Sequence, residues 1–361
     1  MTAAAPPMGA TRRSALREFG SGVLTIMIKE LRSRMRGRRA FVVLTVYLGL
    51  LALITYGVYL IVGPQVRTGM GGLNQANASA IIGQSIFAVL SVFQLILVAF
   101  IAPAFTAGQI SLEREKQTLD LLVSTPLRPG AIVVGKLAAA LAFVVLMIVA
   151  AVPITAIVLM YGGASVGDIV RQQLVLLTSA LALGAIGLFF STWLKRTQAA
   201  TVLTYITMLA LTLGTAMLFA FWTIFAIQSD TGFVQDTNQR APEQLLYVNP
   251  GVAMLDVVSY AEPGGFGGLT GMLSGLRGEP GFGGGVECFG DVCEPVANES
   301  ASGYWWPRIS LTFVVVAFLL TLASMRLVVP AGMRWAFRRR PSGPPAAVVD
   351  PPAGTIEEVE P

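Results

Sequence analysis

Six long apolar runs, separated by polar segments, dominate the chain. Each run holds about 20 or more residues, the length that a helix needs to cross a hydrocarbon core of roughly 30 Å. The runs predict spans at residues 41–63, 81–105, 132–160, 172–194, 199–227 and 308–329. Pro103 and Pro153 fall inside the second and third runs, where proline is expected to kink or interrupt a helix. The pattern predicts an all-α polytopic membrane protein, with the transmembrane domain at 41–329.

A basic amphipathic segment precedes the first run. Residues 1–22 are small, basic and Pro-containing, so we expect a disordered tail there. Over 23–40, apolar residues recur at helical spacing among positive charges that include Lys29, Arg32, Arg34 and Arg36. This predicts an interfacial helix on an anionic leaflet, with membrane lipid as a partner. The alternative is an unstructured basic juxtamembrane tail.

Three other polar segments complete the chain. Residues 106–131 connect the second and third runs, and 228–307 connect the fifth and sixth. In the longer connection, Asn249-Pro250 is typical of a helix start, and a short helix returning to the membrane surface is expected after it. Residues 330–361 are rich in Pro and Ala and end in an acidic stretch, which predicts a disordered tail.

The composition agrees with a membrane protein and orients it. Hydrophobic residues make up 54% of the chain and charged residues 12%, against roughly 25% charged in a soluble domain. With a cytoplasmic amino terminus, the internal segments hold 20 Lys and Arg residues and the external ones 5. The positive-inside rule therefore predicts that both termini are cytoplasmic. We expect a multi-pass protein of a bacterial plasma membrane.

The residue types available exclude most chemistry on this chain. It has no histidine, the commonest general base and metal ligand, and no GxxxxGK[ST] phosphate-binding loop. We therefore expect no enzyme activity, no metal and no cofactor of its own. Cys288 and Cys293 lie in the predicted external segment, where they either form a disulfide or remain unpaired thiols.

Uncharged polar residues occur within the predicted spans, which contain no Asp or Glu. The lack of carboxylates weakens the case for a proton- or sodium-driven transporter. Gln94 has two interpretations: it makes a packing contact between helices, or it lines a translocation pathway. The same alternatives apply to a row of threonines in the fifth run, which are Thr201, Thr204, Thr207, Thr212 and Thr215.

The segment after the second run carries the most specific pattern. Leu112-Glu113-Arg114-Glu115-Lys116 is followed by Thr118-Leu119-Asp120-Leu121-Leu122, then Ser124-Thr125-Pro126 and Gly135-Lys136. Spacing predicts a short amphipathic helix over residues 112–123. The series resembles the signature of ABC-2 type ABC transporter permeases. Members of that family often have Gly at the position of Gln117 and Glu at that of Asp120. Lys29-Glu30-Leu31-Arg32 also resembles their amino-terminal connecting helix.

The resemblance implies a membrane subunit that pairs with a second copy or a homologous permease and contacts separate ATP-binding subunits. ATP and Mg²⁺ would bind to those partners. Coupling to the ATPase would fall to residues of the first connection, which are Glu113, Arg114, Glu115, Lys116, Leu119 and Leu122. An external gate would lie around Pro250, Leu255 and Tyr260. No nucleic-acid partner is implied.

The predicted function is therefore the permease subunit of an ABC transporter that acts as an exporter. Two alternatives remain open at this point. One is an ion-coupled or passive multispan transporter, and the other is a membrane scaffold that recruits a cytoplasmic partner without transport. A neighbouring gene with a phosphate-binding loop would favour the ABC interpretation.

Overall fold

The computed structural model describes residues 20–32, 38–69, 75–117, 129–229, 243–261, 286–289, 292–295 and 305–328. All the described residues belong to one compact unit, and residues 329–361 lie outside the described part of the chain. The predicted tails over 1–22 and 330–361 therefore fall almost entirely outside the description.

Six helical segments in the described part of the chain are long and apolar enough to cross a membrane, as the sequence predicts. The first four spans are α2 (Arg38–Gly69), α3 (Gln75–Thr106), α6 (Pro129–Tyr161) and α7 (Val166–Trp193). The fifth comprises α8 (Thr197–Leu209), a π-helical turn (Ala210–Gly214) and α9 (Thr215–Ser229). The sixth is α12 (Trp305–Val328). Helices α3 and α6 continue through Pro103 and Pro153, so neither proline interrupts its helix.

Shorter elements connect the spans. A helix over residues 20–32 precedes α2, and α4 (Ser111–Glu115) follows α3. A 3₁₀ helix (Glu243–Val248) leads into α10 (Pro250–Ala261) before the sixth span. Strands β1 (Val286–Phe289) and β2 (Val292–Pro295) form an antiparallel hairpin, and its register places the backbone of Cys288 opposite that of Cys293. The predicted interfacial helix over 23–40 is described only to residue 32, and 38–40 belong to α2.

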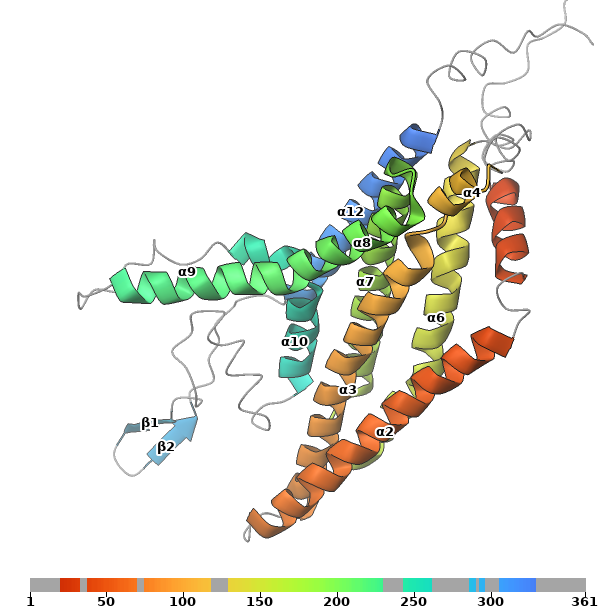
Figure 1. The fold of residues 1–361 in the computed structure, drawn as a ribbon. Helices are drawn as coiled ribbons and strands as arrows, with labels where there is room; N and C mark the ends of the chain where they lie inside the picture. Colours follow the sequence, from red (N-terminus) through yellow and green to blue (C-terminus); the bar gives the residue numbers. More distant parts are fainter. Residues whose placement is uncertain are drawn as a thin grey trace, which may run out of the picture. The chain divides into compact units, whose positions relative to one another are not determined.

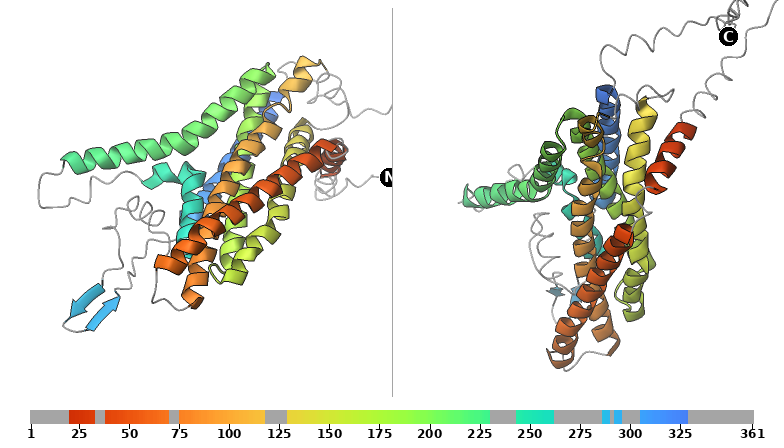
Figure 2. Two further views of the ribbon diagram at one scale, coloured as in Figure 1. Left: turned by 60° about the horizontal axis from the view of Figure 1, so that its bottom comes forward. Right: turned by 45° about the vertical axis from the view of Figure 1, so that its right-hand side comes forward.

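Helices α7 and α3 form the centre of the bundle (Figures 1 and 2). In its most apolar window α7 is 67% buried, whereas α2 is only 11% buried. Close approach of α3 and α7 depends on Gly187, because a Cβ there would collide with the hydroxyl of Thr106. Exposed apolar side chains cover the outer faces of α2, α9 and α12, as expected for helices that meet lipid or another membrane protein.

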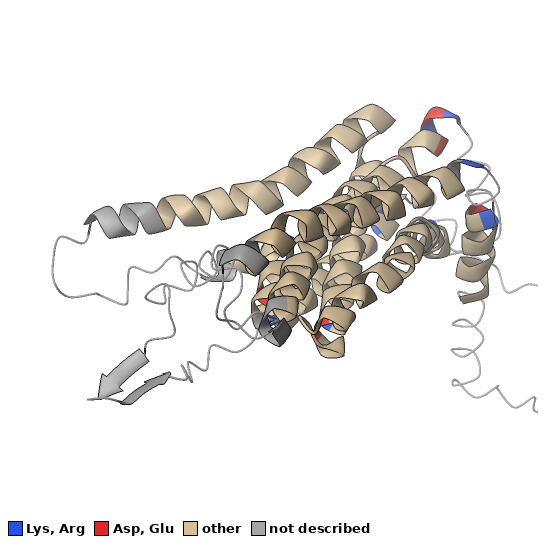
Figure 3. Cartoon of the chain, turned by 90° about the horizontal axis from the view of Figure 1, so that it is seen from below, with Lys and Arg blue, Asp and Glu red and all other residues tan. Residues whose placement is uncertain are grey.

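Charged side chains gather near the ends of the long helices, mainly at α4 and the helix over 20–32 (Figure 3). One boundary corrects the sequence analysis: α7 begins at Val166, so Asp168 and Arg171 belong to the helix of the fourth span. Ser165 and Asp168 form a capping box at its start. The predicted boundary at residue 172 was six residues too late, so the helix of the fourth span does contain a carboxylate, Asp168.

Candidate functional site

The start of α4 is bound to the end of α7. Ser191 of α7 accepts hydrogen bonds from the backbone N–H groups of Ile110 (2.9 Å) and Ser111 (3.1 Å). The hydroxyls of Ser111 and Ser191 lie 3.3 Å apart, and both residues are buried. The first N–H groups of a helix have no partner within the helix. A serine from a span 80 residues away supplies it.

The side of α4 is bound to α6 by an ion pair. Lys136 Nζ lies 2.6 Å from Glu113 Oε1. The Lys136 side chain is 4% exposed and the Glu113 side chain 27%. A buried ammonium is costly without an opposite charge, so Glu113 stabilises Lys136 in this position. The predicted coupling residue Glu113 thus has an intramolecular partner.

The end of α4 is bound to the start of α8. Glu115 Oε1 accepts a hydrogen bond of 2.7 Å from the backbone N–H of Thr197, the first residue of α8. Helix starts favour negative charge because their N–H groups and dipole are positive there. The bond from the Thr197 N–H is the main reason that the pKa of Glu115 is lowered from its ordinary value, and Arg196 adds to the effect. Glu115 is fully exposed and lies beyond the end of α3.

Helix α4 stops at Glu115, although spacing predicted a helix over residues 112–123. Lys116 is its C-cap, and Gln117 follows with φ +56°, in the left-handed region. The Gln117 N–H donates to Arg114 O at 3.2 Å, which is one of the bonds of a Schellman ending. A left-handed residue cannot continue a right-handed helix, so the predicted continuation through Gln117 is wrong. Leu119 and Leu122 lie outside the described residues.

The side chains of Leu112, Arg114 and Lys116, at and just after α4, take no part in these three attachments. Leu112 is 44% exposed and Lys116 is exposed, while Arg114 is half-buried. Among the described residues, neither Arg114 nor Lys116 makes an ion pair. One leucine and two cations are therefore available to a partner on the predicted cytoplasmic side.

The helix over residues 20–32 packs beside this site. A Cβ at Gly135 of α6 would lie 2.9 Å from Ile26 Cβ, so the two helices meet closely because this position is glycine. Lys29 and Arg32 are exposed on this helix. Arg34 and Arg36 lie outside the described residues. The amino-terminal helix, α4 and the start of α6 thus form one continuous region, which we call the coupling region.

At the opposite side, α10 begins at Pro250 as the sequence predicts. It is packed among α3, α7 and α12 rather than at a surface, and Val252, Ala253 and Met254 are buried. Asn249 donates from Nδ2 to Thr212 O (2.8 Å) in the π-helical turn, and its Oδ1 accepts from the Gly251 N–H (2.8 Å). Of the predicted gate residues, Leu255 is half-buried, and the side chain of Tyr260 is not described.

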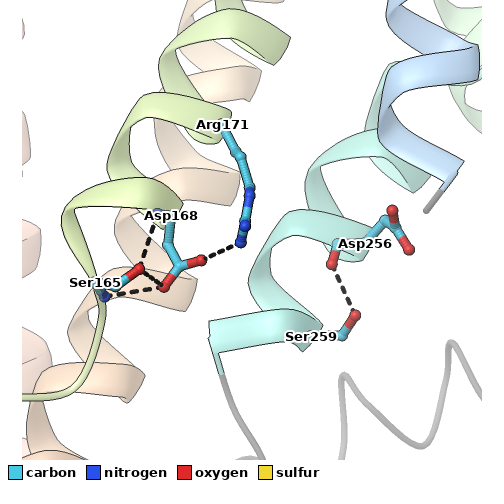
Figure 4. A network of polar contacts seen from close by, with 5 residues as sticks. All are labelled: Ser165, Asp168, Arg171, Asp256 and Ser259. Carbon is cyan, nitrogen blue, oxygen red and sulfur yellow. Dashed lines mark hydrogen bonds and ion pairs between the residues drawn. The ribbon is translucent and has the colours of Figure 1, made fainter.

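Sequence reasoning missed Asp256, which joins α10 to the sixth span. Its Oδ2 accepts from the backbone N–H groups of Trp305 (3.0 Å) and Trp306 (2.9 Å), at the start of α12. Asp256 is fully buried. Figure 4 shows it on α10 together with the network at the start of α7. In that network Asp168 accepts from the Ser165 backbone N–H (2.9 Å) and from Arg171 (2.7 Å).

Gln94 is buried between helices. Its Oε1 accepts a hydrogen bond of 3.1 Å from Gln172 Nε2 of α7. This is the kind of contact that the helix-packing interpretation expects, and a pathway role for Gln94 stays a prediction. The five threonines of the fifth span each donate to the backbone carbonyl four residues earlier. Register places Cys288 opposite Cys293, but their side chains are not described, so the disulfide also stays a prediction.

Six apolar helical spans around a central α7 define a polytopic α-helical membrane protein. Residues 24–339 match the ABC-2 family transporter proteins, so most of the chain agrees with the resemblance found in the sequence. The chain belongs to that family. A comparison with curated proteins gives no match.

Proposed function

We propose that this chain is the membrane subunit of an ABC exporter and that separate ATPase subunits drive it through the coupling region. The observation that carries the proposal is the three-sided attachment of α4. Ser191, Lys136 and Thr197 bind its start, side and end to α7, α6 and α8. A partner that displaces α4 would therefore displace three spans with it.

The chemistry of α4 suits a protein partner. Leu112 can fill an apolar groove, and the cations of Arg114 and Lys116 can pair with carboxylates that fix the register of docking. Because Glu113 and Glu115 bind Lys136 and Thr197, we assign them to internal transmission of force rather than to direct partner contact. This divides the predicted coupling residues into two groups.

ATP and Mg²⁺ would be held by the ATPase partner, because this chain has no phosphate-binding loop. We assign the coupling region to the cytoplasmic side of a bacterial plasma membrane on the strength of its positive charge. The exposed apolar faces of the outer helices supply a surface for a second permease subunit. Asp168 gives no support to ion coupling, because it pairs with Arg171 and caps α7.

The direct test is to co-purify the tagged chain with ATPase subunits and to measure its effect on ATP hydrolysis in liposomes. Leu112→Asp and Lys116→Glu should abolish association, because they place charge or the wrong charge on the exposed face. Glu113→Gln should retain association but lower stimulation of the ATPase, because the α4 to α6 ion pair is lost.

A matched control is Lys195→Glu, a charge reversal at an exposed position of the turn between α7 and α8 that lies outside α4. It should leave association within twofold of the wild type. Full association of Leu112→Asp and Lys116→Glu with a stimulated ATPase would contradict the proposal.

A further inference from the structure

Three buried polar side chains from three helices meet inside the bundle. Tyr47 lies on α2, Gln94 on α3 and Gln172 on α7, and their exposed fractions are 2%, 0% and 0%. Neither the family nor the proposed function assigns them a role.

Their hydrogen-bonding capacity is only partly used. Gln172 donates to Gln94, but Gln94 Nε2, Gln172 Oε1 and the Tyr47 hydroxyl have no hydrogen-bond partner among the described residues. Tyr47 packs in one cluster with Phe93 and Leu97 of α3, the helix that carries Gln94, and its hydroxyl has no hydrogen-bond partner there. If the oxygen and nitrogen of both glutamine side chains were interchanged, the hydrogen bond between the two amides would run the other way. Each amide would still have one atom without a hydrogen-bond partner.

The surroundings offer these groups little else. Tyr47 belongs to an apolar cluster with Leu51, Leu90, Phe143 and Met147. A polar group in an apolar environment costs roughly 2–7 kcal/mol without a hydrogen bond, and membrane lipid supplies none. Nearly all buried polar groups in proteins do have a partner, which is often an ordered water molecule.

We propose that Tyr47, Gln94 and Gln172 form a water-binding site between α2, α3 and α7. Gln94 Nε2 donates to a water molecule that also bonds the Tyr47 hydroxyl, and Gln172 Oε1 accepts from water on the other side of the amide pair. The water between Gln94 and Tyr47 thus has two polar contacts, the lower limit for buried water. Helix α2 is the least buried span, so the water adds hydrogen bonds between α3 and a helix that is held by little direct packing.

Tyr47→Phe tests the proposal by the sign of a stability change. If the hydroxyl bonds to water, its removal lowers the melting temperature in lipid nanodiscs by about 2–4 °C. If the hydroxyl is dry and unpartnered, its removal raises the melting temperature instead. The substitution keeps the ring, so the variant is expected to fold. Tyr205→Phe is a matched comparison, because Tyr205 donates to Phe100 O at 2.9 Å.

Solid-state NMR of the full chain in bilayers detects the water itself. The residue pairs Phe93-Gln94, Arg171-Gln172 and Thr197-Gln198 each occur once in the sequence, so pairwise isotope labelling assigns the three glutamines separately. Gln198 is exposed and serves as the positive control. Magnetisation transfer from water to the Gln94 side-chain amide should reach at least a third of that for Gln198, and Tyr47→Phe should halve it.

Two results would overturn the site. One is the absence of water transfer to both Gln94 and Gln172 while Gln198 gives a full signal. The other is a raised melting temperature of Tyr47→Phe with an unchanged Gln94 signal. Neither result bears on ATPase association, so this proposal and the proposed function succeed or fail separately.

Discussion

Each side of the bundle has a short helix that is hydrogen-bonded to the spans, but the short helix is the donor on one side and the acceptor on the other. At α4, backbone N–H groups of the short helix donate to a span side chain, Ser191. At α10, backbone N–H groups of a span, α12, donate to a side chain of the short helix, Asp256. In each case the orphan N–H groups of a helix start are satisfied from another element.

The difference between the two acceptors has an energetic consequence. Ser191 is a neutral hydroxyl, whereas Asp256 is a carboxylate. Hydrogen bonds to charged groups contribute about 1.5–3 kcal/mol, against about 0.5–1.5 kcal/mol for neutral ones. The α10 side is therefore held more tightly. The α4 side, where we propose that a partner acts, depends on neutral bonds to Ser191, on a partly exposed ion pair and on the fully exposed carboxylate of Glu115.

The largest effect is expected from Asp256→Ala. It leaves the N–H groups of Trp305 and Trp306 without their acceptor in a buried place, so the free energy of unfolding should fall by about 2–3 kcal/mol. Asp256→Asn keeps an acceptor oxygen, so its free energy of unfolding should fall by less. Unfolding in mixed detergent micelles measures both variants. If Asp256→Ala were as stable as the wild type, the conclusion that α10 is held more tightly than α4 would be wrong.

A smaller loss, about 1–2 kcal/mol, is expected from Ser191→Ala, because two N–H groups at the start of α4 lose a neutral acceptor. The same helix offers a matched control in Ser179, which is buried and has no hydrogen-bond partner among the described residues. Ser179→Ala should be neutral or stabilising. The same unfolding assay applies, and an equal loss in both variants would show that Ser191 does not tie α4 to α7.

Gln117→Gly should raise the free energy of unfolding, because it stabilises the left-handed residue that ends α4. Glycine adopts positive φ without the cost that other residues incur, so the gain is up to roughly 1 kcal/mol. Lys116→Gly is the control, since Lys116 has φ −81° and gains nothing. Thermal unfolding in nanodiscs distinguishes the two variants. A loss of stability in Gln117→Gly would contradict the left-handed assignment.

The smallest effect concerns pH. Because the folded-state pKa of Glu115 is lowered, its bond to Thr197 stabilises the fold above the ordinary value of 4.5 and is lost as pH falls through the lower folded-state value. Glu115→Gln should therefore flatten the dependence of melting temperature on pH below about 5. Glu30→Gln, in the amino-terminal helix, serves as the comparison. Identical pH profiles for the wild type and Glu115→Gln would exclude this contribution.

The spans could be predicted because run length alone sets them, and Asn249-Pro250 gave the start of α10 because its chemistry is local. The hydrogen bonds that Ser191 and Asp256 accept could not be predicted from the sequence. Ser191 and Ile110, or Asp256 and Trp305, are far apart in sequence, and no local pattern identifies a serine or aspartate that caps a distant helix. The π-helical turn in the fifth span likewise has no local signal among its small and apolar residues.

The end of α4 is an intermediate case. Amphipathic spacing predicted a longer helix, because glutamine carries no signal for a left-handed position. The family resemblance held the missing information, since relatives often have glycine at the place of Gln117. Glycine at that position is the usual ending of a helix. A departure from the family pattern thus marked a backbone feature that periodicity could not reveal.

The central claim is that an ATPase subunit docks on α4, and photo-crosslinking in membranes tests it most directly. A photoreactive residue at Leu112 or Lys116 should link to a protein that contains a phosphate-binding loop. The same residue at Met160, which is 87% exposed at the opposite end of α6, should not. Crosslinks to the ATPase from Met160 but from neither α4 position would contradict the account.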